Sequence, residues 1–128
     1  MAETMEATFS VEKDVYIKVQ AFYDTGFALK DVINNKDVIL VDYKKVKDRL
    51  PENLQETLER YFLKGITQTD EKVTPIFFST ISGDGSLPGI KALDVKINNK
   101  SIDNVMLAFS QNALTENVNA IFGSDIKK

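Results

Sequence analysis

The pattern of hydrophobic and polar residues is most regular between residues 51 and 65, where it predicts an amphipathic helix. Large apolar side chains recur there at spacings of three and four residues, so they share one side of a helix with about 3.6 residues per turn. Pro51 suits the first helical position because its missing N–H would be unpaired there, and Gly65 suits the residue after the last turn. The sequence thus predicts a helix over about residues 51–64. Its apolar side carries Leu54, Leu58, Tyr61 and Phe62.

A different pattern, strict alternation, runs through residues 14–24 and predicts a half-buried strand. The odd-numbered positions of this segment carry apolar residues and form one face. Tyr16 and Phe22 lie on the opposite face, which is therefore not purely polar. Thr25 and Gly26 are expected to end the strand in a turn.

Three later segments also have the composition of strands: residues 73–82, 90–97 and 102–111. The last of these carries Leu107 on one face and Met106 on the other. Apolar residues on both faces are typical of a strand in the middle of a sheet.

Two further regions carry weaker signals. Residues 27–49 fit either a hairpin that turns at Asn34–Asn35 or a partly helical segment, and periodicity over so few residues does not separate the two. Near the end of the chain, Thr115 is suited to cap a short helix over about residues 115–122, and Gly123 is suited to end it.

These elements together define the α+β class. We expect a mostly antiparallel sheet of five to six strands, packed on the helix at about 51–64, with the short C-terminal helix at about 115–122. The sheet is either open or curled into a partial barrel. The chain divides into a flexible arm over residues 1–8, a single globular domain over residues 9–124 and a tail over residues 125–128. A chain of 128 residues is long enough to bury its own core.

The composition removes many kinds of catalytic chemistry, because the chain contains no cysteine and no histidine. Zinc, copper, haem and iron–sulfur centres lose their usual ligands, and nucleophilic catalysis with a histidine base is excluded. An enzyme would have to use carboxylate, lysine or tyrosine side chains. The residues form no recognisable catalytic constellation, so we assign no catalytic residue, no metal and no cofactor.

The charge balance bears on possible partners. The net charge is −3 and the sequence pI is about 5.0, which gives no general attraction to nucleic acid or to an anionic membrane. No apolar run is long enough to span a bilayer. The first ten residues lack the basic and apolar regions of a signal peptide. We therefore predict a cytoplasmic protein without nucleic-acid or membrane partners.

The segment Ser82–Gly89 has the composition of a loop, with three glycines and a proline. Asp84 and Ser86 make it a candidate loop site, because glycines let backbone N–H groups approach an anion and Asp84 could serve a calcium ion. The spacing matches neither a phosphate-binding loop nor an EF-hand. A plain connection between strands is the simpler interpretation.

Apolar residues on the second face of the strands supply the leading functional hypothesis. The long helix and the short one can hardly cover both faces of a sheet. Either the sheet curls around an interior, or its second face meets another subunit or partner, or the short helix and residues 27–33 fold back over that face. We therefore expect a non-catalytic binding or assembly protein, either a homo-oligomer or a protein that docks a partner through this face or a sheet edge. The expected interface residues are Tyr16, Phe22, Phe77 and Met106.

Two other hypotheses belong to different classes. A pocket between the long helix and a curved sheet, next to Leu58, Tyr61 and Phe62, would make the chain a small apolar-ligand-binding protein. An enzyme that works with carboxylates or lysines ranks third, and the balance of the sequence is against an enzyme.

Overall fold

The computed structural model describes residues 3–65, 72–81, 83–112, 114 and 117–127. In this part of the chain, ten strands form one mixed sheet, accompanied by three short α-helices and a 3-10 helix. The strands are β1 (Glu3–Glu12), β2 (Val15–Tyr23), β3 (Lys30–Asp31), β4 (Lys36–Asp42), β5 (Thr74–Thr80), β6 (Gly83–Lys91), β7 (Asp94–Ile97), β8 (Lys100–Ser101), β9 (Val105–Ser110) and β10 (Ala120–Phe122). The helices are α1 (Tyr43–Val46), η1 (Lys47–Arg49), α2 (Glu52–Lys64) and α3 (Ser124–Lys127).

The predicted fold class is wrong in the number and direction of its strands, although the long helix is present as α2. The sheet has ten strands instead of five or six, and β4 pairs with β9, and β10 with β2, in parallel. The strands outweigh α2, so the molecule is mainly sheet. Alternation within one segment does not reveal which distant segment it pairs with, so the sequence did not disclose the mixed topology.

The short C-terminal helix predicted at about 115–122 is also wrong. Residues 115 and 116 lie outside the described residues, and Ala120–Phe122 form a strand, β10. A short apolar run fits a buried strand as well as one side of a helix, and pairing with β2 and β4 on its two sides decides for the strand. The helix α3 begins later, at Ser124.

The segments predicted as a flexible arm and a tail carry secondary structure in the described residues. Residues 3–8 form most of β1, which pairs with β2 from Glu3 opposite Tyr23 onward. Polar residues on its outer face obscured an alternation that buries Ala7 and Phe9. At the other end, α3 includes residues 125–127, and its Ile126 is buried.

Residues 27–49 combine the two interpretations given for them. β3 and β4 form a hairpin, and Asn35 takes a positive φ of 54° in the turn between them. Asparagine tolerates this left-handed conformation better than most residues. Residues 43–49 are then helical, as α1 and η1.

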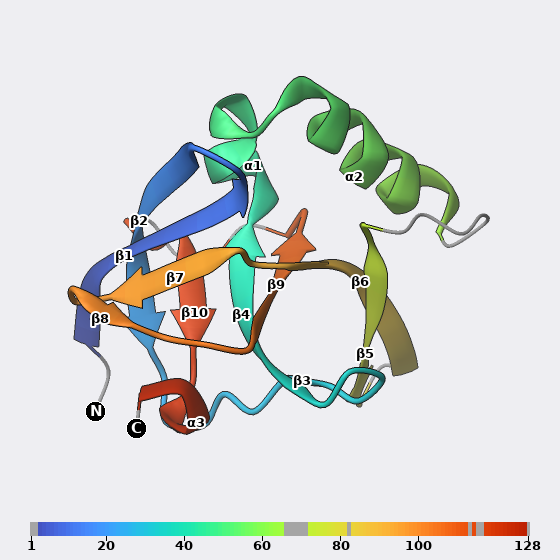
Figure 1. Cartoon of the computed structure of the whole chain (residues 1–128). Helices are drawn as coiled ribbons and strands as arrows, with labels where there is room; N and C mark the ends of the chain where they lie inside the picture. Colours follow the sequence, from blue (N-terminus) through green and yellow to red (C-terminus); the bar gives the residue numbers. More distant parts are fainter. Residues whose placement is uncertain (1–2, 66–71, 82, 113, 115–116, 128) are drawn as a thin grey trace.

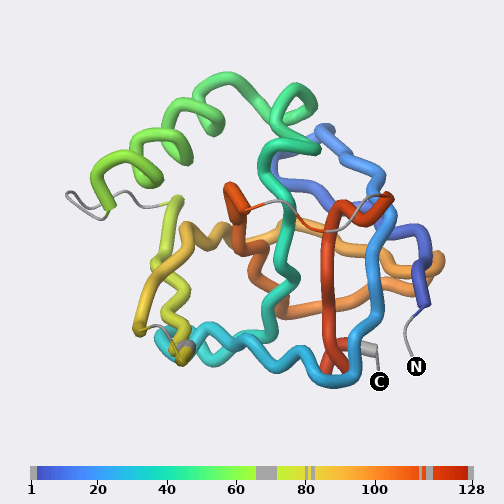
Figure 2. The backbone as a smooth tube through the Cα atoms, turned by 180° about the vertical axis from the view of Figure 1, so that it is seen from behind, coloured from blue at the N-terminus to red at the C-terminus, as the bar shows by residue number. Residues whose placement is uncertain are grey.

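The middle of the sheet brings together segments that are far apart in the chain. β10 lies between β2 and β4, parallel to the first and antiparallel to the second (Figures 1 and 2). Ala120 stands opposite Ala21 on one side and Val41 on the other. β9 pairs with the other edge of β4. The two ends of β10 therefore lie beside the ends of strands formed much earlier in the sequence.

Apolar cores occupy both sides of the sheet. The larger core includes Phe9, Phe109 and Phe122, and α2 covers it with Leu54 and Leu58. Full burial of one large apolar side chain contributes about 1.5–3 kcal/mol. The burial of Leu54 and Leu58 therefore holds α2 against the rest of the molecule. The smaller core, on the opposite side, consists of Val38, Ile76, Met106 and Ala108.

A polar cluster attaches α2 to the end of β4. The Tyr43 hydroxyl donates to Glu59 Oε2 at 2.6 Å, and Lys47 Nζ lies 3.1 Å from the same oxygen. Burial, followed by the hydrogen bond to Glu59, raises the pKa of Tyr43 far above its ordinary value. The hydrogen bond from Tyr43, with one from Lys47, lowers the pKa of Glu59. The cluster therefore favours neutral Tyr43 next to ionised Glu59.

Candidate active site

Residues Asp24–Gly26 form the turn that follows β2, and this turn presents a carboxylate. The Asp24 carboxylate accepts a hydrogen bond from the Gly26 N–H at 2.9 Å, and the Asp24 carbonyl accepts one from the Phe27 N–H at 3.0 Å. Aspartate favours such a turn because its side chain reaches the backbone two residues on. Asp24 is partly exposed, so its carboxylate is held in place and remains accessible.

β10 and the residue after it support the Asp24 turn. The Asp24 N–H donates to the Phe122 carbonyl at 3.0 Å, and the rings of Tyr23 and Phe122 stack with their centroids 5.4 Å apart. Gly123 approaches the turn so closely that a Cβ there would lie 2.0 Å from the Phe27 carbonyl oxygen. Any residue other than glycine would have to displace the turn. Two strands that meet only in the folded chain thus position Asp24.

The Asp24 turn borders a groove of about 810 Å³, to which Gly26 and Phe27 contribute. The lining comes from residues 26–30 and Val32, from the β5–β6 hairpin, from Leu40 of β4, and from Ser110, Asn112 and Leu114 at and after the end of β9. Most of these side chains are apolar, and Lys30 is the charged one. The volume falls in the range of ligand sites, about 300–1,000 Å³. The groove therefore suits a chain segment with apolar side chains.

Exposed apolar side chains stand at the groove and at the tip of its hairpin. Val32 is 76% exposed and Phe77 is 52% exposed, and both line the groove. Ile81, at the tip of the β5–β6 hairpin, is fully exposed. Large apolar groups gathered at one opening are typical of a surface that binds another molecule.

The buried aspartates serve the fold. Asp31 accepts hydrogen bonds from the backbone N–H groups of Ile33 and Asn34 and from the Asn34 amide. Asp42 accepts one from the Leu114 N–H and lies near Lys45. In contrast, Asp24 is accessible beside the groove. The described residues hold no group of three or more Asp, Glu, His or Cys side chains suited to a metal ion.

The structure separates the four residues predicted to form an interface. Met106 is buried in the smaller core, where it packs with Ile76 of β5. The reason is that the β5–β6 hairpin covers the second face of the sheet, which a count of helices did not include. Tyr16 is 60% exposed on β2, and Phe22 is partly buried. Phe77 lines the groove.

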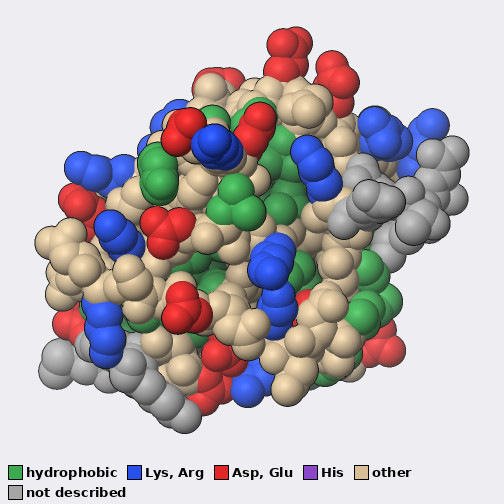
Figure 3. Space-filling view, in the orientation of Figure 1, with side chains coloured by type: hydrophobic (Ala, Val, Ile, Leu, Met, Phe, Trp, Pro, Cys, Tyr) green, Lys and Arg blue, Asp and Glu red, His purple; other side chains and the backbone are tan. Residues whose placement is uncertain are grey.

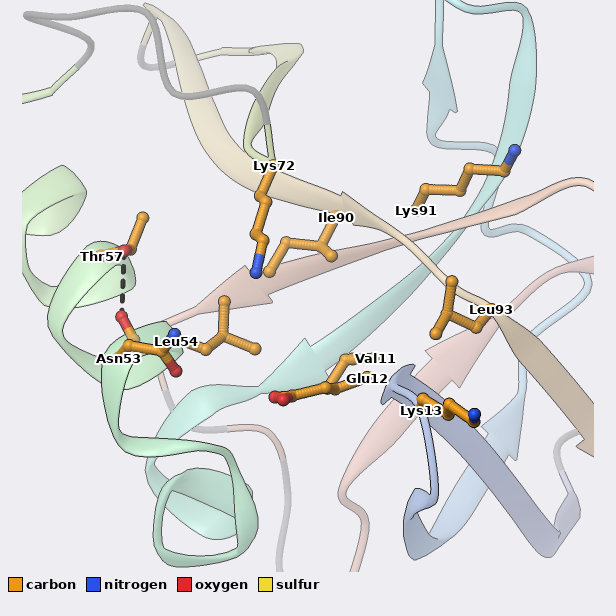
Figure 4. Close-up of a pocket in the computed structure, with 10 residues that line it drawn as sticks. All are labelled: Val11, Glu12, Lys13, Asn53, Leu54, Thr57, Lys72, Ile90, Lys91 and Leu93. Atoms are coloured by element: carbon orange, nitrogen blue, oxygen red, sulfur yellow. Dashed lines mark hydrogen bonds between the residues drawn. The ribbon is translucent and has the colours of Figure 1, made fainter.

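The structure does not bring Leu58, Tyr61 and Phe62 together in a pocket. Leu58 is fully buried, the Tyr61 hydroxyl is hydrogen-bonded to the Ser86 hydroxyl at 2.6 Å, and Phe62 packs on Tyr43. A hollow of about 370 Å³ lies instead at the first turns of α2 (Figure 4). Leu54 and Glu12 point into this hollow, and the amine of Lys91 points away from it.

The segment predicted as a loop site belongs to the β5–β6 hairpin, because residues 83–91 form β6. Asp84 accepts a hydrogen bond from the Ser79 hydroxyl across the hairpin, and Ser86 pairs with Tyr61.

Acidic and basic side chains are interspersed on the face shown in Figure 3. None of the helices in the described residues has both the length and the apolar character that a membrane span requires.

Sequence reasoning missed Asp24, because Thr25 and Gly26 were interpreted only as the end of a strand. The available signal was an aspartate at the end of an alternating apolar strand with a glycine two residues later. A second signal was the apolar pair Ile121–Phe122 directly before Gly123, which ends the strand β10 and not a helix. Neither signal identifies a site until the two segments are placed side by side.

An accessible carboxylate, fixed by two strands next to an apolar groove, is what an enzyme that acts with carboxylates on an extended substrate requires. The family model Peptidase_U4, described as sporulation factor SpoIIGA, matches residues 3–121. Because this match spans nearly the whole chain, the protein belongs to that peptidase family. None of the curated proteins matches the chain. The family overturns the prediction of a non-catalytic binding, assembly or structural protein.

Proposed function

We propose that this protein is a peptidase that cleaves peptide bonds with a pair of aspartates, and that Asp24 is the member supplied by each chain. The position of Asp24 carries the proposal: its carboxylate is accessible, fixed by its own turn and by β10, and adjacent to the groove. Membership of a peptidase family supports the same function.

The composition limits which peptidase chemistry the chain can supply. Without cysteine or histidine, a cysteine nucleophile and a histidine general base are excluded. Carboxylates remain, and two aspartates that share one proton are an established means of peptide-bond hydrolysis. Asp24 meets the geometric requirement better than Asp31 or Asp42, which are buried and engaged with the backbone.

The second aspartate would be Asp24 of another copy of the chain. Among the described residues, the lining of the groove contains no acidic side chain, and Asp24 lies two residues before the lining residue Gly26. A two-fold axis through the site would place the same residue on both sides of the substrate, as isologous interfaces do. The exposed side chains of Val32, Phe77 and Ile81 would then be covered by the partner or by substrate.

The two carboxylates share one proton, so one of them acts as the general base and the other as the general acid. The ionised carboxylate takes a proton from water as the water oxygen attacks the carbonyl carbon of the scissile bond. The protonated carboxyl donates its proton to the carbonyl oxygen. The carboxyl that took the proton from water then donates it to the amide nitrogen, the C–N bond breaks, and the other carboxylate takes a proton from a hydroxyl of the tetrahedral diol, which yields the carboxylic acid and the amine and restores the shared proton. The apolar groove would hold the substrate chain on either side of this bond.

The replacement Asp24→Asn tests the proposal. It keeps the size of the side chain and removes its acid–base function, so we expect cleavage to fall by about a thousandfold, within the usual contribution of general acid–base catalysis. The measurement is hydrolysis of a fluorogenic peptide library with a central pair of large apolar residues, from pH 4 to 7. Asp103→Asn, at an exposed position, serves as the control. Unchanged cleavage by Asp24→Asn would contradict the proposal.

A further inference from the structure

The described residues between β9 and β10 contribute to the lining of the groove. β9 and β10 flank β4, with Ser110 beside Asp42 on one side and Ala120 beside Val41 on the other. Leu114 and Asn119 are both hydrogen-bonded to Asp42, so these residues lie at the C-terminal end of β4. We call residues 110–112, 114 and 117–119 the strap. Its members Ser110, Asn112 and Leu114 line the groove.

Two side chains tie the strap to the end of β4. Asp42, the last residue of β4, is fully buried, and its Oδ2 accepts a hydrogen bond from the Leu114 N–H at 2.9 Å. Lys45 of α1 donates to the carbonyls of Leu114 at 3.4 Å and Val118 at 2.6 Å. Its Nζ lies 3.7 Å from Asp42 Oδ2. The Asp42 N–H also donates to the Asn119 carbonyl at 2.8 Å.

This arrangement is costly for stability alone. A buried carboxylate loses its hydration, and Asp42 Oδ1 has no hydrogen-bond partner within the described part of the chain. A pair of apolar residues in place of Asp42 and Lys45 could fill the same volume. Such a pair could not form the hydrogen bonds that these two residues make with the N–H and the carbonyl of Leu114. What the ion pair adds is a fixed position for the strap.

The structure assigns Asp42 and Lys45 as positioning residues that fix the strap as a substrate-binding wall of the groove. Both act through Leu114, whose backbone they hold on two sides and which itself lines the groove. They would determine how tightly the substrate chain binds, and not how fast the bond is cleaved. This inference rests on the proposed peptidase function and deepens it.

The chemical step is spared because hydrogen bonds at both ends of β10 tie it to β2 and to the Asp24 turn independently of Lys45. The Asn119 N–H donates to the Gln20 carbonyl at 2.9 Å, and the Gln20 N–H donates to Asn119 Oδ1 at 2.9 Å. Further along β10, the Phe122 carbonyl holds the Asp24 N–H. Loosening of the strap at Leu114 and Val118, where Lys45 binds it, therefore leaves the Asp24 turn in place.

The test compares Lys45→Met with Lys44→Met. The first replacement keeps the aliphatic length of a half-buried side chain and removes its bonds to the strap, and the second changes an exposed neighbour. The most rapidly cleaved peptide of the fluorogenic library serves as substrate. We expect Lys45→Met to raise KM by about tenfold, the effect of losing one hydrogen bond to a charged group, with kcat within about twofold. Lys44→Met should leave both constants unchanged.

Amide hydrogen exchange at Leu114 supplies a readout that does not need catalysis. Exchange should become at least about tenfold faster in Lys45→Met, because the strap opens more often. Asp42→Asn, which keeps an acceptor for the Leu114 N–H, is the second variant should Lys45→Met fail to fold, and its KM should rise as well.

The possible outcomes separate the two proposals. Equal KM values for Lys45→Met and Lys44→Met, in a protein whose cleavage depends on Asp24, would overturn the inference and leave the peptidase function standing. A fall in kcat at unchanged KM would overturn it too, because that result gives Lys45 a role in the chemical step. If the unmodified protein cleaves no member of the library, both proposals fall together.

Discussion

At the scale of single residues, the site depends on Gly123 as much as on Asp24. A methyl group at position 123 would overlap the Phe27 carbonyl, which belongs to the backbone of the Asp24 turn. We therefore expect Gly123→Ala to cost about 1–3 kcal/mol, as overpacking does, and to reduce cleavage because the turn shifts. Thermal unfolding and the peptide assay measure the two effects.

Gly65→Ala is the matched control for that prediction. Gly65 has a positive φ of 68° but no atom within 4 Å of the position of an added Cβ, so its replacement strains the backbone without a steric clash. It should lower stability by about 1 kcal/mol and leave cleavage intact. Equal loss of cleavage in both variants would show that instability, and not displacement of the turn, is responsible.

The sequence identifies residues poorly when their role depends on a distant segment. The absence of histidine and cysteine limits an enzyme to other side chains, but it does not select Asp24 among the acidic residues. That selection requires Phe122 and Gly123, which lie nearly a hundred positions later. Met106 is the converse case: its apolar character predicts burial, but what covers it is the β5–β6 hairpin and not a partner.

At the scale of elements, the attachment of α2 should depend on pH at both ends of the range. The raised pKa of Tyr43 means that its stabilising effect is complete below the ordinary tyrosine value of 10.0 and is lost as pH rises above it. The lowered pKa of Glu59 means that its effect is complete above 4.5 and is lost as pH falls through the folded value.

Tyr43→Phe removes the Tyr43 effect and the part of the Glu59 effect that comes from the hydrogen bond of Tyr43, while Lys47 remains beside Glu59. The difference in free energy of unfolding between the native protein and this variant should therefore form a plateau between pH 4.5 and 10.0 and shrink on either side. The plateau reflects the part-buried hydrogen bond between the Tyr43 hydroxyl and Glu59, which the variant lacks. Urea unfolding at several pH values measures it. A difference that stays constant from pH 3 to 11 would contradict the assignment.

Elements with local signals are those that the sequence predicts well. α2 carries its apolar spacing, its starting proline and its ending glycine within one segment, and it lies at Glu52–Lys64. β10 carries only three apolar residues, and its identity as a strand comes from β2 and β4 on its two sides. The parallel pairing of β4 with β9 also leaves no mark in either segment.

At the scale of the whole molecule, the proposal that two copies share one site predicts a particular mixing curve. When native protein is mixed and equilibrated with rising fractions of Asp24→Asn, activity per total protein should fall as the square of the native fraction, because only pairs of native chains hold two aspartates. The variant alone should have the same mass in solution as the native protein. A linear decrease would show that each chain works by itself.

The place of β10 has a consequence for how the protein is made. Since this late strand lies between two strands formed early, the Asp24 turn lacks its support until residues 120–123 have left the ribosome. Under the proposed function, a nascent chain or one truncated before residue 120 would carry Asp24 without the fixed turn that cleavage requires. Peptide cleavage would thus be withheld until residues 120–123 have been synthesised and have paired with β2 and β4.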